Sequence, residues 1–234
     1  MLVAQQIVRD AVRQRLGAGD PLPSEKLMLE EYQIGRGTLR EALRLLEYQG
    51  LIVLRPGPGG GPVLTTPDGS ELANLWKLRM QLDRSPYRVI VEARSALEPM
   101  ISRLAAERIT EATLDQLQAT IDVMRATDTD SGLFFQENQR FHELIAHASD
   151  NVVFASMVNS LLNVLHGTSM GYDYATDRRR NTVKAHETIL AALKSGDPDE
   201  AEAAMKRHID GYTRTSKGQY PGLLDQTITW DRSG

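Results

Sequence analysis

The apolar residues of the first 66 positions recur at helical spacing three times and then form two short β-rich runs. Helices are predicted over 2–16, from Ser24 to about Tyr32, and over 36–48. Two β-rich runs, 51–54 and 63–66, flank a tip rich in Gly and Pro at 55–62. Strand-like runs joined by such a tip are typical of a β-hairpin. Three helices followed by a hairpin predict a winged helix-turn-helix over residues 1–67.

From residue 68 onward the apolar spacing is helical, with no convincing strand. A linker helix is expected at 70–83, within a linker of residues 68–86, and six or so amphipathic helices with short loops follow. Such helices predict an antiparallel bundle over 87–216. Residues 217–234 carry no clear pattern and are expected to form a loose tail. The predicted fold class is mainly α: a winged helix-turn-helix followed by an all-α bundle.

Composition narrows the class of protein. The net charge is −4, and residues 1–66 hold eight Lys/Arg against seven Asp/Glu, a net +1, which leaves −5 for the remainder. Bulk charge therefore gives little support to nucleic-acid binding, and any case must rest on where the arginines lie. The absence of cysteine excludes disulfides and thiolate metal sites. No apolar segment is long enough to cross a bilayer and the N-terminus is not a signal peptide, so a cytoplasmic protein without membrane contact is expected.

The predicted third helix carries a row of arginines. Arg36, Arg40 and Arg44 recur four residues apart, on a different face from the apolar stripe that includes Leu39 and Leu43. Guanidinium groups in such a row can contact phosphates and guanine edges in a major groove. The alternative is a solvated face in which Arg44 pairs with neighbouring glutamates. The Gly/Pro tip favours the first interpretation, because a bare backbone tip can approach a minor groove while Arg55 reaches phosphate.

Three segments of this first domain closely resemble the GntR family of bacterial transcriptional regulators: Leu22-Pro-Ser-Glu-Lys26, Ile34-Gly-Arg-Gly-Thr-Leu-Arg-Glu-Ala-Leu43 and Leu46-Glu-Tyr-Gln-Gly-Leu-Ile52. The resemblance implies contacts with a double-stranded operator from Lys26, Arg36, Thr38 and Arg40, with a wing at Gly57 and Gly59–Gly61. Arg44, Arg55, Gly59 and Gly60 complete the expected DNA-binding set. The chain departs from the family at Gly35 and Gly37, where small hydroxyl residues are usual.

Three histidines fall on inward faces of predicted helices. His142, His186 and His208 each share a face with apolar neighbours, and Asn138 lies one turn before His142. Imidazole nitrogens suit Zn, Ni, Fe or Cu, and three or four protein ligands would leave open positions. The alternative is that each is a core histidine bonded to a backbone carbonyl. Nine residues separate His147 from Asn138, which places it on the opposite face.

The segments around these histidines resemble the ligand-sensing FCD domain of the FadR subfamily of GntR regulators. They are Asn138-Gln-Arg-Phe-His142, Ala185-His186-Glu-Thr-Ile and Met205-Lys-Arg-His208, with Val91–Glu98 and Leu104–Arg108 matching its opening helix. In many members an Asp and three His bind a metal at these positions; here Asn138 replaces the Asp. The resemblance implies a divalent transition metal, Zn or Ni, and a small carboxylate effector that completes its coordination.

Arg94 is the candidate second anchor for that effector, because a bidentate guanidinium suits a carboxylate. A salt bridge from Arg94 to Glu98 on the same helix is the alternative. The run Arg178–Arg180 is expected to be a solvated helix start.

The functional hypothesis is an effector-responsive regulator, a repressor, that binds a palindromic operator as a homodimer. The rival class is a metal-dependent hydrolase with a nucleic-acid-binding module. The sequence does not favour it, since no His-Glu-x-x-His occurs and no acid is obviously placed as a general base.

Overall fold

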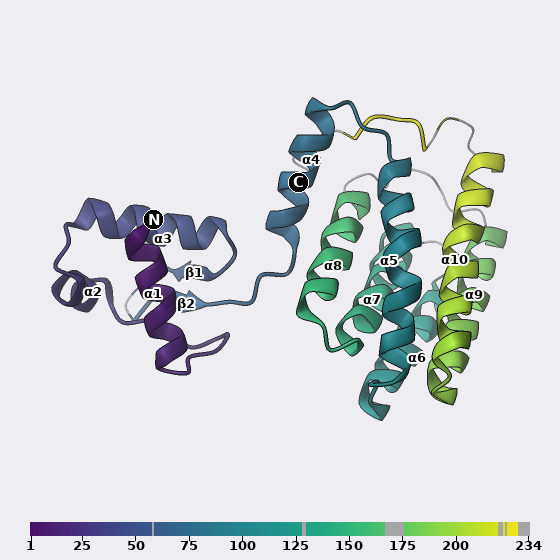
Figure 1. Cartoon of the computed structure of the whole chain (residues 1–234), viewed down its shortest axis with the longest axis horizontal. Helices are drawn as coiled ribbons and strands as arrows, with labels where there is room; N and C mark the ends of the chain where they lie inside the picture. The colour runs from purple at the N-terminus through teal and green to yellow at the C-terminus, as the bar shows by residue number, and fades with distance from the viewer. Residues whose placement is uncertain (58, 128–129, 167–175, 220–221, 223, 229–234) are drawn as a thin grey trace. The chain divides into compact units, whose positions relative to one another are not determined.

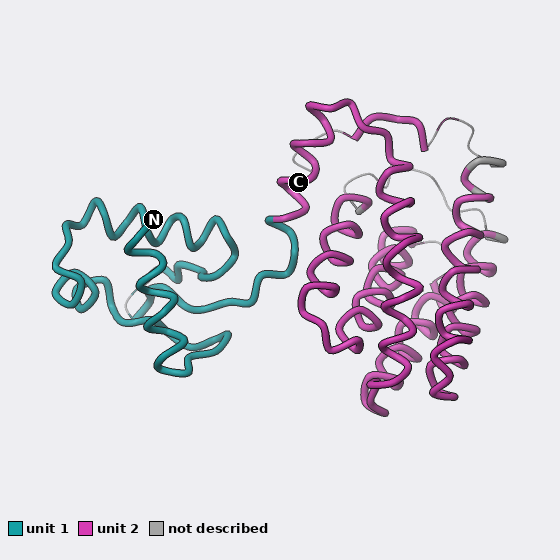
Figure 2. Tube along the Cα trace, viewed as in Figure 1, with its two compact units in different colours: residues 1–71 teal, residues 72–234 magenta. Residues whose placement is uncertain are grey.

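The computed structural model describes the chain apart from residues 58, 128–129, 167–175, 220–221, 223 and 229–234. The chain divides into two compact units, Met1–Glu71 and Leu72–Gly234 (Figure 2). The division falls in the first turn of α4 (Ser70–Leu82), which occupies the position predicted for the linker helix. No helix among the described residues is long and apolar enough to cross a membrane.

The first unit is the predicted winged helix-turn-helix (Figure 1). Its elements are α1 (Leu2–Arg13), α2 (Glu25–Tyr32), α3 (Arg36–Tyr48), β1 (Ile52–Arg55) and β2 (Gly61–Leu64). The two strands pair antiparallel with Ile52 opposite Leu64 and Arg55 opposite Gly61. The Ser24 hydroxyl accepts a hydrogen bond from the amide of Leu27, as an N-cap should.

Apolar stripes of the three helices close the core of this unit. Leu39, Leu43 and Leu46 of α3 are buried with Ile7 of α1 and Met28 of α2. The stripe on α3 faces inward because these residues follow the three-to-four spacing of one helix face. The opposite face of α3 is therefore left in solvent, which is where the arginine row lies.

A buried carboxylate joins α1 to α2. The hydroxyl of Tyr32 donates to Oδ2 of Asp10 over 3.1 Å, and the amide of Gln6 donates to the same carboxylate. Arg13, one turn later on α1, forms an ion pair with Asp10 at 2.9 Å. Burial, together with the hydrogen bond and the negative charge of Asp10, raises the pKa of Tyr32 to about 12.

The second unit is a bundle of antiparallel helices in which α5 packs against several others (Figure 1). The helices after α4 are α5 (Arg88–Ala106), α6 (Glu111–Ala126), α7 (Ser131–Ala148), α8 (Val152–His166), α9 (Thr176–Ser195) and α10 (Pro198–Gln219). Helix α5 contacts α7, α8, α9 and α10, so its inward face lies at the centre of the unit. Thr110 and Asp130 cap α6 and α7 through their side chains, as their positions before the apolar runs predict.

The C-terminal segment differs from the expected loose tail. Helix α10 continues to Gln219, and Leu224 and Ile228 are buried. The backbone amide of Arg88 donates to the carbonyl of Leu224, and the amide of Ile228 donates to the carbonyl of Ser85. Residues 224–228 show no helical periodicity because they pack through two isolated apolar side chains and backbone hydrogen bonds.

The expectation of a solvated arginine run at the start of α9 was wrong for two of its three residues. Arg178 and Arg179 are buried, and only Arg180 is exposed. The guanidinium of Arg179 donates to the carbonyl of Thr127 and to Oγ of Ser131, and it lies over the ring of Phe134. Arg178 lies over the ring of Tyr212 on α10. Aromatic faces and backbone oxygens replace water here, a tertiary environment that the sequence pattern does not reveal.

Candidate sensing and DNA-binding sites

Three histidines from three helices meet in the core of the second unit. His142 of α7, His186 of α9 and His208 of α10 have ring nitrogens that all lie within 4.8 Å of one another. His142 and His186 are buried, and His208 is half-buried. The Nε2 atoms of His142 and His208 are 3.2 Å apart. The structure thus brings together the three residues whose helical faces predicted that they would point inward.

The imidazole ring of His186 has no hydrogen-bond partner among the described residues. Both of its ring nitrogens are buried and have no partner among the described residues. The ring of Phe141 stacks on it at a centroid distance of 3.9 Å with an interplanar angle of 9°. The alternative of a core histidine bonded to a backbone carbonyl therefore does not describe His186. Buried polar atoms are rarely left without partners, so these nitrogens are suited to binding a ligand.

Electrostatics keep His186 and His208 neutral. Burial, followed by the charges of His208, His142 and Arg94, lowers the pKa of His186 well below its usual range. Burial, with the charges of His142 and Arg94, lowers the pKa of His208 to about 3, against an opposing effect of Glu98. Neutral imidazoles carry the lone pair that a metal ion requires. At neutral pH both rings are therefore in the form that can coordinate a cation.

Arg94 and Glu98 of α5 form a buried pair that contacts the cluster through His142. The Nε of Arg94 donates to Oε1 of Glu98, the salt bridge that the sequence left open as an alternative. The other carboxylate oxygen, Oε2, lies 2.5 Å from Nδ1 of His142. Both Arg94 and Glu98 are buried. Burial raises the pKa of Glu98, but the charges and hydrogen bonds of Arg94 and His142 outweigh it and hold that pKa well below its usual range.

The remaining polar candidates lie around the cluster at different depths. Asn138 is half-buried on α7, one turn before His142, and stays a predicted fourth ligand. His147, at the end of α7, is exposed and lies 3.4 Å from the amide nitrogen of Asn159. Its predicted exclusion from the site agrees with this position. The side chain of His166 lies outside the described residues.

The arginine face of α3 is exposed. Arg36, Thr38 and Arg40 are in solvent, as is Lys26 on α2. Arg44 is exposed as well and forms an ion pair with Glu41 at 3.3 Å, whereas Glu47 instead accepts from the backbone amide of Leu54. Within the described parts of the chain, Lys26, Arg36, Arg40 and Arg55 form no salt bridge. Their charges are available to a polyanion.

The tip of the hairpin is held by glycine. Gly57 and Gly59 have φ of +93° and +80°, which side chains rarely tolerate, and Gly60 donates its amide to the carbonyl of Gly57. A Cβ on Gly60 would lie 2.2 Å from the carbonyl oxygen of Arg55. The tip therefore needs glycine at Gly60 because a Cβ there would clash, and at Gly57 and Gly59 because their φ angles are positive.

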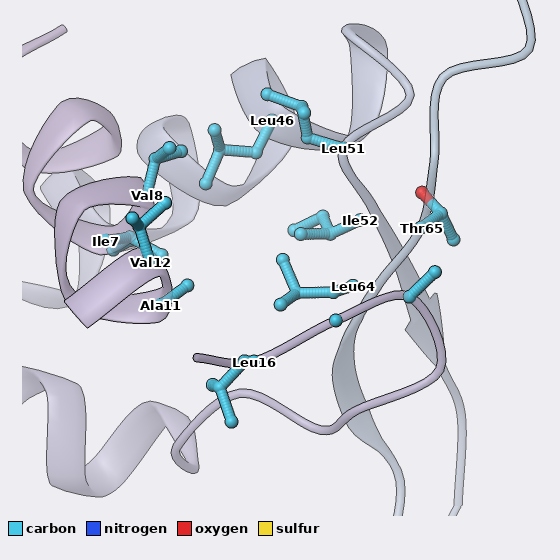
Figure 3. A pocket seen from close by; sticks show the side chains of 12 residues that line it. Ile7, Val8, Ala11, Val12, Leu16, Leu46, Leu51, Ile52, Leu64 and Thr65 are labelled. Atoms are coloured by element: carbon cyan, nitrogen blue, oxygen red, sulfur yellow. The ribbon is translucent and has the colours of Figure 1, made fainter. Parts of the chain in front are cut away.

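An apolar pocket in the first unit carries no comparable chemistry. It lies between the C-terminal half of α1 and the base of the hairpin (Figure 3). The side chains that line it include Ile7, Val12, Leu16, Leu51 and Leu64. The lining contains no charged group, so the pocket offers neither metal ligands nor a counter-ion.

Sequence patterns missed the full role of three residues of the second unit. Glu98 was considered only as a partner for Arg94, Phe141 was not considered as part of the site, and Arg179 was expected to be solvated. The only available signals were the four-residue spacing of Arg94 and Glu98 and the adjacency of Phe141 to His142. Their partners lie 44 or more residues away in the chain, which no local pattern encodes.

A helix-turn-helix with an exposed arginine face, joined to a helical unit with a buried histidine cluster, defines a ligand-sensing DNA-binding regulator. Comparison with known families agrees: residues 2–60 match the gntR family of bacterial regulatory proteins, and residues 89–211 match the FCD domain. The chain belongs to the GntR family of transcriptional regulators and carries an FCD effector-binding domain, as FadR-like members do. This family consists of regulators rather than enzymes, which removes the hydrolase alternative.

Individual relatives have the same organisation over most of their length. The HTH-type transcriptional regulator YcbG of Bacillus subtilis is 34% identical over 208 residues, which cover 88% of this chain and 85% of YcbG. The HTH-type transcriptional repressor NanR of Cronobacter sakazakii is 26% identical and covers 92% of this chain and 84% of its own. The solved structure of Streptococcus agalactiae GntR superposes with a TM-score of 0.71 at 25% identity, covering 92% of this chain and 98% of that one.

Proposed function

We propose that the chain is an effector-responsive repressor that binds a palindromic operator as a homodimer in the cytoplasm and senses a small carboxylate at a metal site. The observation that carries the sensing part is His186, a buried imidazole with two unpartnered nitrogens beside two further histidines. The observation that carries the DNA-binding part is the exposed arginine face of α3. Repression, rather than activation, is supported by the similarity over most of the chain to NanR, which is named as a repressor.

His142, His186 and His208 would hold the metal, with Asn138 as a fourth ligand. Two nitrogens bound to one tetrahedral Zn²⁺ at about 2.0–2.1 Å lie about 3.3 Å from each other. The 3.2 Å between the Nε2 atoms of His142 and His208 fits this spacing. Imidazole ligands suit Zn or Ni, and a bound cation would supply a positive charge with open coordination positions.

A small carboxylate suits the electrostatics of this site. The charge of Arg94 is close enough to lower the pKa of His186 and of His208, so it also attracts an anion beside the cluster. Arg94 remains the proposed second anchor of the effector, in addition to its bond with Glu98. A carboxylate between a cation and a guanidinium would be neutralised on both sides.

The operator is proposed to be contacted by side chains of α2 and α3 and by the wing. The helix residues are Lys26, Arg36, Thr38, Arg40 and Arg44, and the wing contributes Arg55 and the backbone of Gly59 and Gly60. Effector binding is proposed to change the relative placement of the two DNA-binding units of the dimer, with α4 as the connecting helix.

The DNA-binding proposal is tested with duplexes selected from a random pool by the full-length protein. Arg40→Ala should weaken binding at least tenfold and reduce the dependence of affinity on salt by about one counter-ion. Arg9→Ala is the matched control, because Arg9 is an exposed arginine of α1 in the same unit. Equal affinities of Arg40→Ala and the wild type would exclude α3 as the reading helix. The proposed dimer is tested by analytical ultracentrifugation of the protein–DNA complex, which should have the mass of two chains on one symmetric duplex.

The sensing proposal is tested by elemental analysis and a ligand screen. Purified wild type should contain Zn or Ni, and a His142→Ala/His186→Ala double variant should lose it. Small organic acids are then screened by thermal shift with and without added metal. A hit should release the selected duplex from the wild type but not from the double variant. Full metal occupancy in the double variant would exclude this site.

A further inference from the structure

The carboxylate of Glu98 contacts two groups of the candidate site at once. Its Oε1 accepts from Nε of Arg94, one turn earlier on α5, and its Oε2 lies 2.5 Å from Nδ1 of His142 on α7. The side chains of Glu98 and His142 are almost fully buried, with exposed fractions of 3% and 0%. Water therefore does not compete for these bonds, and the geometry of the carboxylate constrains the imidazole ring.

This contact determines which nitrogen of His142 carries the proton. A carboxylate next to a buried guanidinium is ionised, so it can only accept hydrogen bonds. Nδ1 of His142 must then donate, and in a neutral ring this leaves the lone pair on Nε2. Nε2 is the atom that lies 3.2 Å from Nε2 of His208. The Glu98 contact thus presents the lone pair of His142 to the other histidines.

We propose that Glu98 is a positioning residue of the metal site: its carboxylate selects the Nδ1–H tautomer of His142 and aims Nε2 at the cluster. The inference rests on the proposed function, because it concerns the same site. Carboxylates that accept from the second nitrogen of a ligating histidine fix its orientation and raise its basicity. Arg94 has a corresponding part, since it is the counter-ion that keeps Glu98 ionised.

A simple buried ion pair between Arg94 and Glu98 is the competing explanation. Such a pair on one helix needs only one carboxylate oxygen and makes no demand on α7. The second oxygen of Glu98, however, bonds a residue 44 positions away, on a helix that contributes a member of the cluster. The two explanations differ in what a neutral residue at position 98 does to the metal and to the tautomer of His142.

The test compares Glu98→Gln with Glu92→Gln in the full chain. Glu92 is an exposed glutamate of the same helix and serves as the matched control. Zn²⁺ and Co²⁺ affinities are measured by competition with a chelator. Loss of a second-shell partner typically weakens metal binding about 10- to 100-fold, which is the decrease expected for Glu98→Gln but not for Glu92→Gln. The Co²⁺ absorption bands should also change in Glu98→Gln, because the field of the His142 ligand changes.

A second readout does not depend on metal. In chelator-treated protein with ¹⁵N-labelled histidine rings, wild-type His142 should show a protonated Nδ1 and a bare Nε2. Glu98→Gln should give a mixture of tautomers, because a glutamine amide can either accept from or donate to Nδ1. The signals of the five histidines are assigned with single His→Ala variants.

Loss of folding is separated from loss of positioning by the double variant Arg94→Gln/Glu98→Gln, which removes both buried charges together. It should recover most of the melting temperature lost in Glu98→Gln while keeping the weakened metal binding. Wild-type affinity within threefold in Glu98→Gln, together with an unchanged His142 tautomer, would overturn the inference and leave the proposed function intact. If the wild type bound neither Zn²⁺ nor Co²⁺, the proposed function would fail, and the tautomer measurement alone would still decide whether Glu98 positions His142.

Discussion

The Nε2 atoms of His142 and His208 lie 3.2 Å apart, although 66 residues separate them and they come from α7 and α10. His186 from α9 is the third member of the cluster, and ring nitrogens of all three histidines lie within 4.8 Å of one another. A cation bound there would be shared by three imidazole nitrogens from three helices, so the folded state of this unit should respond to metal.

Added Zn²⁺ is expected to stabilise the chelator-treated protein against heat, because an ion that binds only the folded state adds to its free energy. At one hundred times the dissociation constant the gain is about 2.7 kcal/mol. His208→Ala should abolish the shift in melting temperature measured by calorimetry, whereas His147→Ala, on the exposed end of α7, should keep it. An equal shift in both variants would show that Zn²⁺ binds elsewhere.

Gly60→Ala is expected to disrupt the wing. The added methyl group would lie 2.2 Å from the carbonyl oxygen of Arg55 and 2.9 Å from that of Gly57, so the backbone between these two residues would have to move. We expect the free energy of unfolding of the first unit to fall by about 1–3 kcal/mol and the affinity for a selected duplex to fall with it. Chemical denaturation and gel shifts measure the two effects, and unchanged values in both would contradict the structure of the tip.

Gly37→Ala should do the opposite for stability. Gly37 lies in the first turn of α3, where a Cβ meets nothing within 4 Å and φ is not positive. Removing the flexibility of glycine in a helix stabilises it by about 0.5–1 kcal/mol. Urea denaturation should therefore show a higher midpoint than in the wild type. A lower midpoint would mean that the backbone at Gly37 is not helical as described.

Arg179→Ala is expected to destabilise the second unit by about 2–4 kcal/mol. The buried guanidinium bonds the carbonyl of Thr127 and the hydroxyl of Ser131, so its loss leaves two half-buried oxygens without these donors. Arg180→Ala is the control, because Arg180 is exposed and surface ion pairs contribute at most about 1 kcal/mol. Comparable losses in the two variants, measured by urea denaturation, would contradict the buried position of Arg179.

Tyr32 should ionise later than an ordinary tyrosine. Its pKa is raised to about 12 by burial and by Asp10, so the bond to Asp10 contributes its full stability below pH 10 and loses it as pH rises through 12. Absorbance at the tyrosinate band should show a late component from Tyr32. Tyr32→Phe should remove that component, and its stability deficit relative to the wild type should shrink toward pH 12. A pH-independent deficit would argue against the Asp10 contact.

The sequence by itself determined the fold class, the helix and hairpin positions and the inward faces of His142, His186 and His208, because periodicity, capping residues and Gly/Pro tips act within one element. Departures came where a residue's partner is distant in the chain. The arginines at the start of α9 have an ordinary solvated pattern, yet Arg179 is buried against Phe134, Thr127 and Ser131. Residues 224–228 were assigned no structure because their contacts, two buried apolar side chains and backbone hydrogen bonds to residues 85–88, leave no periodic pattern in the sequence.

Tertiary structure alone decided how the histidine cluster is organised. Helical spacing places each imidazole on an inward face but does not fix the depth or rotation of its helix, so it cannot set a distance of a few ångströms between rings. The same limit applies to Glu98, whose bond to His142 depends on how α5 packs against α7. Local propensity chooses the elements, whereas packing of elements distant in sequence chooses which polar atoms meet and in which protonation state.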